Sequence, residues 1–206
     1  MKKVIIFDMD GTLVNSSITI ANAINYVRKH LGFEPMNEEK ILRLVNDNTI
    51  NPAQVFYHAK TFDKDHEKWF SEYYSKHHGH ELVLYDGIYE LLKKLKEKGC
   101  KLAIATNAYR VSALESLEHL KIVDFFESVI CADDVPQAKP SPLMLYEILE
   151  EVKCSKNEAV FIGDGPRDQE AGERANMDYL MVDWGFTEHS NAIQSVDALE
   201  KILMEL

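Results

Sequence analysis

The chain has 206 residues, of which 46% are hydrophobic and 28% are charged, as is usual for a soluble globular protein. Its formal net charge of -11 at pH 7 argues against sequence-independent binding to nucleic acid or to an anionic membrane, because both need basic patches. No apolar run approaches the roughly 20 residues that span a bilayer, and aspartates interrupt the apolar run at the N-terminus where a signal peptide would continue. We therefore expect a cytoplasmic protein with no nucleic-acid or membrane partner.

The three cysteines are widely spaced and form no CxxC pair. An odd number of isolated cysteines suggests neither a disulfide framework nor a zinc site. Reduced thiols are the simplest expectation.

Five short apolar runs, rich in β-branched residues, alternate with segments of helical periodicity. Runs that are apolar on both faces are typical of parallel strands covered by helices on each side. The alternation predicts an α/β domain with a doubly wound, Rossmann-like parallel sheet. The expected strands are residues 3–7, 101–106, 128–132, 159–163 and 179–183.

Capping residues predict where several helices begin and end. Gly99 is expected to stop a helix that carries an apolar stripe from Ile88 onward. Ser141 and Pro142 are expected to be the N-cap and first residue of a later helix, and Asp197 the N-cap of the last one.

The segment from about residue 15 to residue 83 carries helical patterns and no convincing strand. Asn37 and Asn51 are the expected N-caps of two of its helices. We therefore predict an α/β core domain formed by residues 1–14 and 84–206, and an inserted helical domain formed by residues 15–83. The two connections between the domains would form a double hinge.

Asp8 and Asp10 directly follow the first predicted strand, in the sequence FDMDGT. Ligands of open α/β sheets bind at the carboxyl ends of the strands. Side chains two positions apart on an extended segment point the same way, and Gly11 allows a sharp turn after them. Both carboxylates can therefore face one site, although two solvated aspartates at a strand end are the simpler alternative.

Three later segments place complementary groups near strand ends. Thr106 and Asn107 end the second strand before a helix, where they could seat a phosphate or serve only as a helix cap. Lys139 is the cation expected beside carboxylates and a transferring phosphoryl group, although a lone lysine is usually a solvated surface charge. Asp164 and Asp168, in GDGPRD, follow the fourth strand and could otherwise merely cap a helix.

Four carboxylates that converge on one site repel one another, and some would protonate unless a cation lay among them. All the candidate ligands are hard oxygens, with no convergent histidine or cysteine. Such a set suits Mg²⁺, with water completing the coordination.

The segments FDMDGT, TN, KP and GDGPRD, in this order, resemble the four motifs of the haloacid dehalogenase superfamily. The helical segment after the first motif resembles the helical cap of that superfamily, and ADDVPQAKPSP is similar to phosphoglycolate phosphatase-like hydrolases. The resemblance covers nearly the whole chain. It implies a magnesium-dependent phosphatase that hydrolyses a small phosphorylated metabolite, a phosphomonoester.

The resemblance also implies catalytic and phosphate-binding roles. Asp8 would attack phosphorus and form an aspartyl-phosphate. Asp10 would protonate the leaving group and then activate water. Thr106, Asn107 and Lys139 would hold the phosphoryl oxygens.

The same resemblance implies the metal site. Mg²⁺ would be bound by the Asp8 carboxylate, the main-chain carbonyl of Asp10 and Asp164. Asp168 would act through water or by orienting the ligands. The cap would close over the site and exclude water.

Other functions stay open at this point. A phosphomutase acting on a sugar phosphate would share the same chemistry, a haloacid dehalogenase would need no metal, and a non-catalytic domain would only bind phosphate. Residues 44–50 of the helical segment contain no glycine, and Asn46, Asn48 and Thr49 suggest a neutral polar contact surface. We expect a monomer or a weak homodimer.

Overall fold

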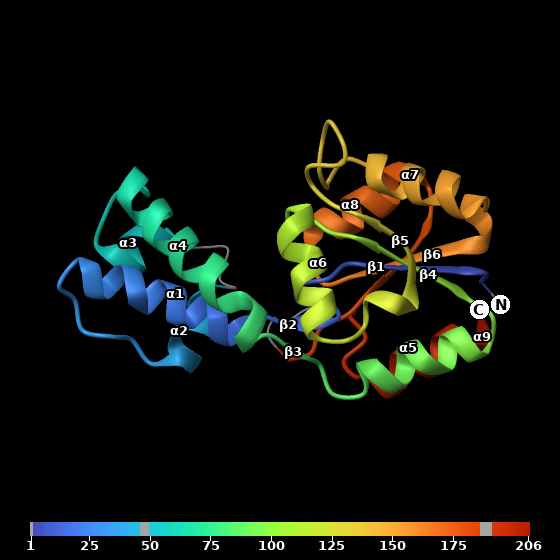
Figure 1. The fold of residues 1–206 in the computed structure, drawn as a ribbon, viewed down its shortest axis with the longest axis horizontal. Coiled ribbons are helices and arrows are strands. Elements are labelled where there is room, and N and C mark those ends of the chain that lie inside the picture. The colour runs from blue at the N-terminus through green and yellow to red at the C-terminus, as the bar shows by residue number, and fades with distance from the viewer. Residues whose placement is uncertain (1, 46–49, 186–190) are drawn as a thin grey trace. The chain divides into compact units, whose positions relative to one another are not determined.

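The computed structural model describes residues 2–45, 50–185 and 191–206, without the side chains of residues 78–80. The chain forms two compact units. One consists of the chain up to Asn15 together with Val83–Leu206, and the other of Ser16–Leu82. Figure 1 shows the first unit around β1 and the second around α1.

A five-stranded sheet forms the centre of the first unit, in the order β5-β4-β1-β6-β7. All of its pairings are parallel. From β1 the chain adds β4 and β5 on one side of the sheet, and then β6 and β7 on the other side of β1. The strand order therefore reverses between β1 and β6, and ligands of such sheets bind at this reversal. The predicted doubly wound α/β fold is confirmed. The strands are β1 (Val4–Phe7), β4 (Lys101–Ala105), β5 (Phe126–Ile130), β6 (Ala159–Gly163) and β7 (Asp178–Met181).

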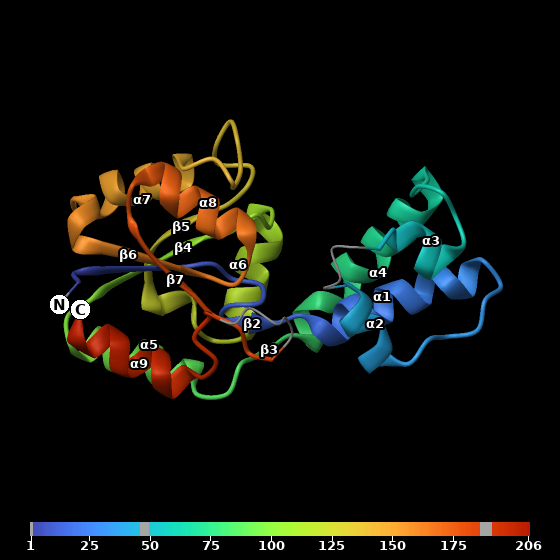
Figure 2. The same ribbon diagram turned by 180° about the vertical axis from the view of Figure 1, so that it is seen from behind.

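Helices cover both faces of this sheet. On one face lie α7 (Leu143–Val152) and α8 (Pro166–Ala175), and on the other lie α5 (Ile88–Glu97) and α9 (Val196–Glu205), as Figures 1 and 2 show from opposite sides. The helix α6 (Arg110–His119) and the short 3-10 helices η1 (Val123–Phe125) and η2 (Lys156–Glu158) also belong to this unit.

The sequence pattern of α5 explains how it packs. Its aliphatic residues recur at positions i, i+3, i+4 and i+7 and are all buried. Each buried leucine or isoleucine of this kind contributes roughly 1.5–3 kcal/mol relative to an exposed one. The predicted stop is confirmed, since α5 ends before Gly99, which has a φ of +82°.

A two-residue antiparallel ladder lies where the chain leaves and rejoins the first unit. It pairs β2 (Val14–Asn15) with β3 (Val83–Leu84). The sequence did not predict these strands, because two residues are too short to show a periodicity.

Several expected boundaries were wrong by one or two residues. The fifth strand, for example, occupies Asp178–Met181 rather than residues 179–183. The third strand occupies Phe126–Ile130 rather than residues 128–132, since Phe126 already pairs with Leu102 across a shift in register. The helix α7 begins after Pro142, which is itself the N-cap in place of Ser141. The N-cap of α9 is Ser195 rather than Asp197, because the Ser195 hydroxyl accepts from the Ala198 N–H at 3.2 Å.

The second unit consists of four described helices, α1 (Ser17–His30), α2 (Glu38–Val45), α3 (Pro52–Tyr57) and α4 (Lys64–Glu81). Asn37 accepts from the Lys40 N–H and Asn51 from the Gln54 N–H, as expected of N-caps. The core of the unit consists of Ala21, Ile24, Val27, Ile41, Phe56 and Tyr57.

An apolar pocket of about 430 Å³ opens in this helical unit, between α1, α3 and α4. The predicted polar contact residues Asn46, Asn48 and Thr49 lie outside the described residues. None of the helices in the described part of the chain combines the length and apolar character that a membrane crossing requires.

Candidate active site

The carboxyl end of the central strand carries Asp8. Its main-chain N–H donates to the Ile162 carbonyl of β6 at 2.8 Å, so the pairing of β1 with β6 continues up to Asp8. Asp164 follows β6 directly. Parallel pairing therefore brings these two residues to one sheet edge, although they lie 156 positions apart in the chain, from 8 to 164.

Lys139 joins two carboxylates of this edge. Its Nζ donates to Asp8 Oδ1 at 2.5 Å and to Asp168 Oδ1 at 2.6 Å. The lysine is only 5% exposed, and a buried ammonium depends on such charged partners. Burial alone would lower the pKa of Lys139, but attraction by Asp8 and Asp168 raises it above its ordinary value. Lys139 is therefore a protonated cation at neutral pH.

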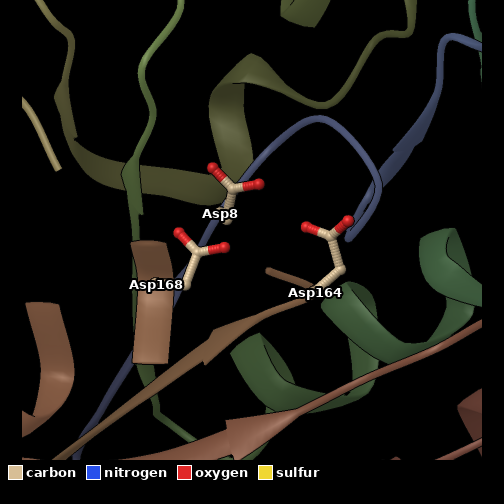
Figure 3. A group of neighbouring side chains, drawn as sticks. All are labelled: Asp8, Asp164 and Asp168. Carbon is tan, nitrogen blue, oxygen red and sulfur yellow. The ribbon is translucent and has the colours of Figure 1, made fainter. Parts of the chain in front are cut away.

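Three carboxylates gather at this edge, and Figure 3 shows the side chains of Asp8, Asp164 and Asp168 close to one another. Asp8, Asp164 and Asp168 each offer an oxygen within 4.8 Å of the others. Burial raises the pKa of Asp8 well above its usual range, opposed by Lys139 and reinforced by the other two carboxylates. Burial and then Asp168 raise the pKa of Asp164 to about 6. The cluster carries more acidic groups than Lys139 can neutralise, and it therefore favours an added cation.

Two glycines give these carboxylates room. Gly11 has a φ of +83°, and a β-carbon there would lie 2.2 Å from Asp164 Oδ2. A β-carbon on Gly163 would lie 2.5 Å from the Asp168 Cβ. Only glycine fits at either position, because real β-carbons do not approach so closely.

Further hydrogen bonds orient the acidic pair that follows β6. Thr12 Oγ1 donates to Asp164 Oδ1 at 3.4 Å. The Gly165 N–H donates to Asp168 Oδ2 at 3.1 Å, at the start of α8. Asp168 thus caps α8 with one oxygen and binds Lys139 with the other.

The predicted phosphate-binding residues of the second motif lie beside Lys139. The Asn107 amide exchanges two hydrogen bonds with the Lys139 main chain, each at 3.0 Å. Thr106 is buried, and its Oγ1 accepts from the Ala108 N–H at 3.1 Å. These contacts hold the Lys139 loop against the end of β4, while contact of Thr106 and Asn107 with phosphoryl oxygens stays a prediction.

Asp10 lies on the same turn as Gly11 and is half-buried. Its main chain bridges Val14 at the start of β2. Within the described residues, the group of acidic oxygens lying within 4.8 Å of one another does not include the Asp10 side chain. The structure therefore brings Asp8, Asp164 and Asp168 together as a carboxylate group that does not include the Asp10 carboxylate.

Sequence reasoning missed two aromatic residues beside this turn. Trp184 Nε1 donates to the Thr12 carbonyl at 2.9 Å. The Tyr85 ring lies 5.9 Å from the Trp184 ring, and burial, followed by the charges of Asp164 and Asp10, raises the pKa of Tyr85. In the sequence, Trp184 appears only as part of a Trp-Gly pair after the fifth predicted strand. This pair by itself does not indicate a contact with Thr12.

The comparison with protein families defines the class of this protein. Residues 5–182 match the model of the haloacid dehalogenase-like hydrolases. The chain belongs to this family, as the four motifs suggested.

Individual relatives cover most of the chain. A phosphoglycolate phosphatase of Psychrobacter arcticus is 33% identical over 196 residues, which cover 90% of this chain and 85% of that protein. A pyrophosphatase PpaX of Listeria monocytogenes serotype 4a is 31% identical over 207 residues, which cover 96% and 92%. The structure of a haloacid dehalogenase-like family hydrolase from Streptococcus pneumoniae matches with a TM-score of 0.78 at 25% identity, covering 100% of this chain and 99% of that one.

Proposed function

We propose that this chain is a magnesium-dependent phosphatase that hydrolyses a small phosphorylated metabolite through an aspartyl-phosphate on Asp8. The observation that carries the proposal is the buried Asp8 carboxylate at the end of β1, bound by Lys139 at 2.5 Å and flanked by Asp164 and Asp168. Family membership and relatives named as phosphatases support it.

The donor set fits Mg²⁺. The carboxylates of Asp8 and Asp164 and the main-chain carbonyl of Asp10 would hold the ion, and Asp168 would orient the ligands, directly or through water. All of these groups are oxygen donors, and the acidic cluster exceeds the charge of Lys139. When bound, the cation would neutralise charge on Asp8 and on the phosphoryl oxygens.

The protein groups can divide the reaction into two steps. Since Oδ1 of Asp8 accepts from Lys139, we assign the attack on phosphorus to Oδ2. The bond from phosphorus to the leaving oxygen breaks as Asp10 donates a proton to that oxygen. Asp10 then takes a proton from water, which attacks the aspartyl-phosphate, releases inorganic phosphate and restores Asp8.

The remaining assignments belong to the same proposal. Thr106, Asn107 and Lys139 hold the phosphoryl oxygens. Residues 1–14 and 84–206 act as the catalytic core, and residues 15–83 act as a cap that excludes water during the reaction. We propose a cytoplasmic enzyme, monomeric or weakly dimeric, that binds neither nucleic acid nor membrane, in keeping with its net charge of -11.

A second candidate substrate is inorganic pyrophosphate. The relative named pyrophosphatase PpaX is similar over 96% of this chain. The attack by Asp8 is the same on a phosphoanhydride, with phosphate as the leaving group in place of an alcohol. The nucleophile is therefore shared by both candidates, and only the leaving group differs.

Phosphate release by the wild type and by Asp8→Asn, with Mg²⁺, tests the proposal. The substrates are p-nitrophenyl phosphate, phosphoglycolate, pyrophosphate and a panel of sugar phosphates. We expect the wild type to release phosphate, and Asp8→Asn to be slower by roughly a thousandfold or more, because the attacking carboxylate is gone. Full activity in Asp8→Asn would refute the nucleophile, and isomerisation of a sugar phosphate without phosphate release would indicate a mutase.

A further inference from the structure

Trp184 lies just after β7, next to two residues whose backbones are hydrogen-bonded to other segments. The Val182 N–H donates to the Gly163 carbonyl at 3.0 Å, and the Asp183 N–H donates to the Ile193 carbonyl at 2.9 Å. The backbone that carries Trp184 is thus tied to the end of β6, beside the acidic cluster.

The turn that Trp184 reaches is closed largely by its own hydrogen bonds. The Met9 carbonyl accepts from the N–H groups of Leu13 and Val14, each at 2.9 Å, and the Gly11 N–H donates to the Val14 carbonyl at 2.9 Å. The Thr12 carbonyl accepts from outside the turn, from Trp184 Nε1 at 2.9 Å. Thr12 is fully buried, where the loss of a hydrogen-bond partner is costly.

The same turn seats Asp164. Thr12 Oγ1 donates to Asp164 Oδ1 at 3.4 Å, and Asp164 Oδ2 occupies the space where a Gly11 β-carbon would stand. A shift of the Gly11–Thr12 backbone would therefore displace the Asp164 carboxylate.

We propose that Trp184 is a positioning residue for the metal site, acting through Thr12. Its indole N–H holds the Thr12 carbonyl and so fixes the turn against which the Asp164 carboxylate rests. The inference rests on the proposed function, because it takes Asp164 to be a ligand of Mg²⁺. Groups that orient metal ligands typically change metal affinity by 10–100-fold when removed.

The composition of the chain supplies a matched control, because it has two tryptophans. Trp184→Phe removes the indole N–H but keeps a ring that can pack near Tyr85. Trp69→Phe makes the same change in α4 of the helical unit, where Trp69 stacks on His30 at 4.7 Å between ring centroids. We expect calorimetric titration with Mg²⁺ to show binding at least about tenfold weaker in Trp184→Phe, and unchanged in Trp69→Phe.

Fluorescence gives a second, independent readout. In Trp69→Phe the remaining tryptophan is Trp184, and its emission should change on Mg²⁺ addition with the dissociation constant that calorimetry gives. This titration also decides the question if Trp184→Phe does not fold. A saturable change supports the proposal, and an emission that does not respond overturns it.

The Mg²⁺ affinities of the wild type and of Trp184→Phe distinguish an error in the role of Trp184 from an error in the proposed function. Equal Mg²⁺ affinity in the wild type and in folded Trp184→Phe overturns the role of Trp184 and leaves the metal site standing. No Mg²⁺ binding by the wild type overturns both.

Discussion

Lys139 makes the contacts on which the carboxylate cluster most depends. Its ammonium binds Asp8 and Asp168 at 2.5 and 2.6 Å in a nearly dry environment. Breaking one side of a buried charge network leaves uncompensated charge, which costs far more than losing a surface ion pair. Lys139 therefore contributes to the stability of the fold as well as to the proposed chemistry.

Lys139→Met should lower the free energy of unfolding by roughly 3 kcal/mol at pH 7 in EDTA. Burial already raises the pKa of Asp8, and loss of Lys139 raises it further. A carboxyl with a raised folded-state pKa stabilises the fold when protonated, and this stability is lost as the pH rises. The deficit should therefore be larger at pH 7 than at pH 5 in urea unfolding.

The exposed Lys93 of α5 offers a control for that substitution. Lys93→Met removes the same charge from the surface and should change the stability by less than about 0.5 kcal/mol. If both variants unfold at the urea concentration of the wild type, Lys139 is not part of a stabilising charge network.

At the scale of elements, the turn between β1 and β2 is held by its own hydrogen bonds and by a close approach to Asp164. Gly11 has a φ of +83°, and a β-carbon there would lie 2.2 Å from Asp164 Oδ2. Gly99, after α5, has a φ of +82° with no atom within 4 Å of the place where a β-carbon would stand. The two glycines share a conformation and differ in their surroundings. Alanine substitutions at the two positions therefore distinguish the effect of backbone strain from the effect of displacing the Asp164 carboxylate.

Gly11→Ala and Gly99→Ala should each cost about 1–2 kcal/mol of stability, because alanine disfavours a positive φ. Gly11→Ala should also push Asp164 aside and lower both Mg²⁺ affinity and turnover by about tenfold or more. Gly99→Ala should keep both values. Urea unfolding and Mg²⁺-dependent phosphate release measure the two effects, and equal turnover in the two variants would contradict the close packing of Gly11 on Asp164.

The sheet and the position of Asp8 at its edge were predictable because both depend on local pattern. Apolar runs on both faces indicate parallel strands, and a polar residue at the end of such a run lies at the edge where ligands bind. The two-residue strands β2 and β3 and the Ser195 cap were not predictable. Such short strands leave no pattern in the sequence, and neighbouring residues can serve equally well as caps.

The partners of each site residue were also beyond the sequence. Lys139 reaches Asp8 across 131 positions, and Trp184 reaches Thr12 across 172. Such contacts follow from strand order and loop geometry, which no local pattern encodes. The motifs therefore predicted candidate residues of the site, and the structure shows which of their atoms meet.

At the scale of the whole molecule, metal binding and folding of the α/β unit should be linked. The proposed ligands come from the segment that follows β1 and from the segment that follows β6. A ligand that binds only the folded state stabilises it, by about 2.7 kcal/mol at a concentration 100 times its dissociation constant. The ion would thus hold distant segments of the chain together.

Mg²⁺ should therefore raise the melting temperature of the wild type by several degrees, and EDTA should reverse the rise. Asp164→Asn should lose most of this Mg²⁺-induced rise in melting temperature, because one metal ligand is weakened. Asp197→Asn makes the same change at an exposed position of α9 and should retain the full rise. Calorimetric melts check the prediction, and an equal Mg²⁺ response in all three proteins would place the ion elsewhere.

Trapping the covalent intermediate tests the central claim most directly. Wild type, Asp8→Asn and Asp10→Asn would be quenched with acid during turnover with Mg²⁺, digested, and examined by mass spectrometry for a phosphorylated peptide. We expect phosphate on Asp8 in the wild type, more of it in Asp10→Asn, where water is activated slowly, and none in Asp8→Asn. A wild type that turns over without a phosphorylated Asp8 peptide, or with the phosphate on another residue, would contradict the account.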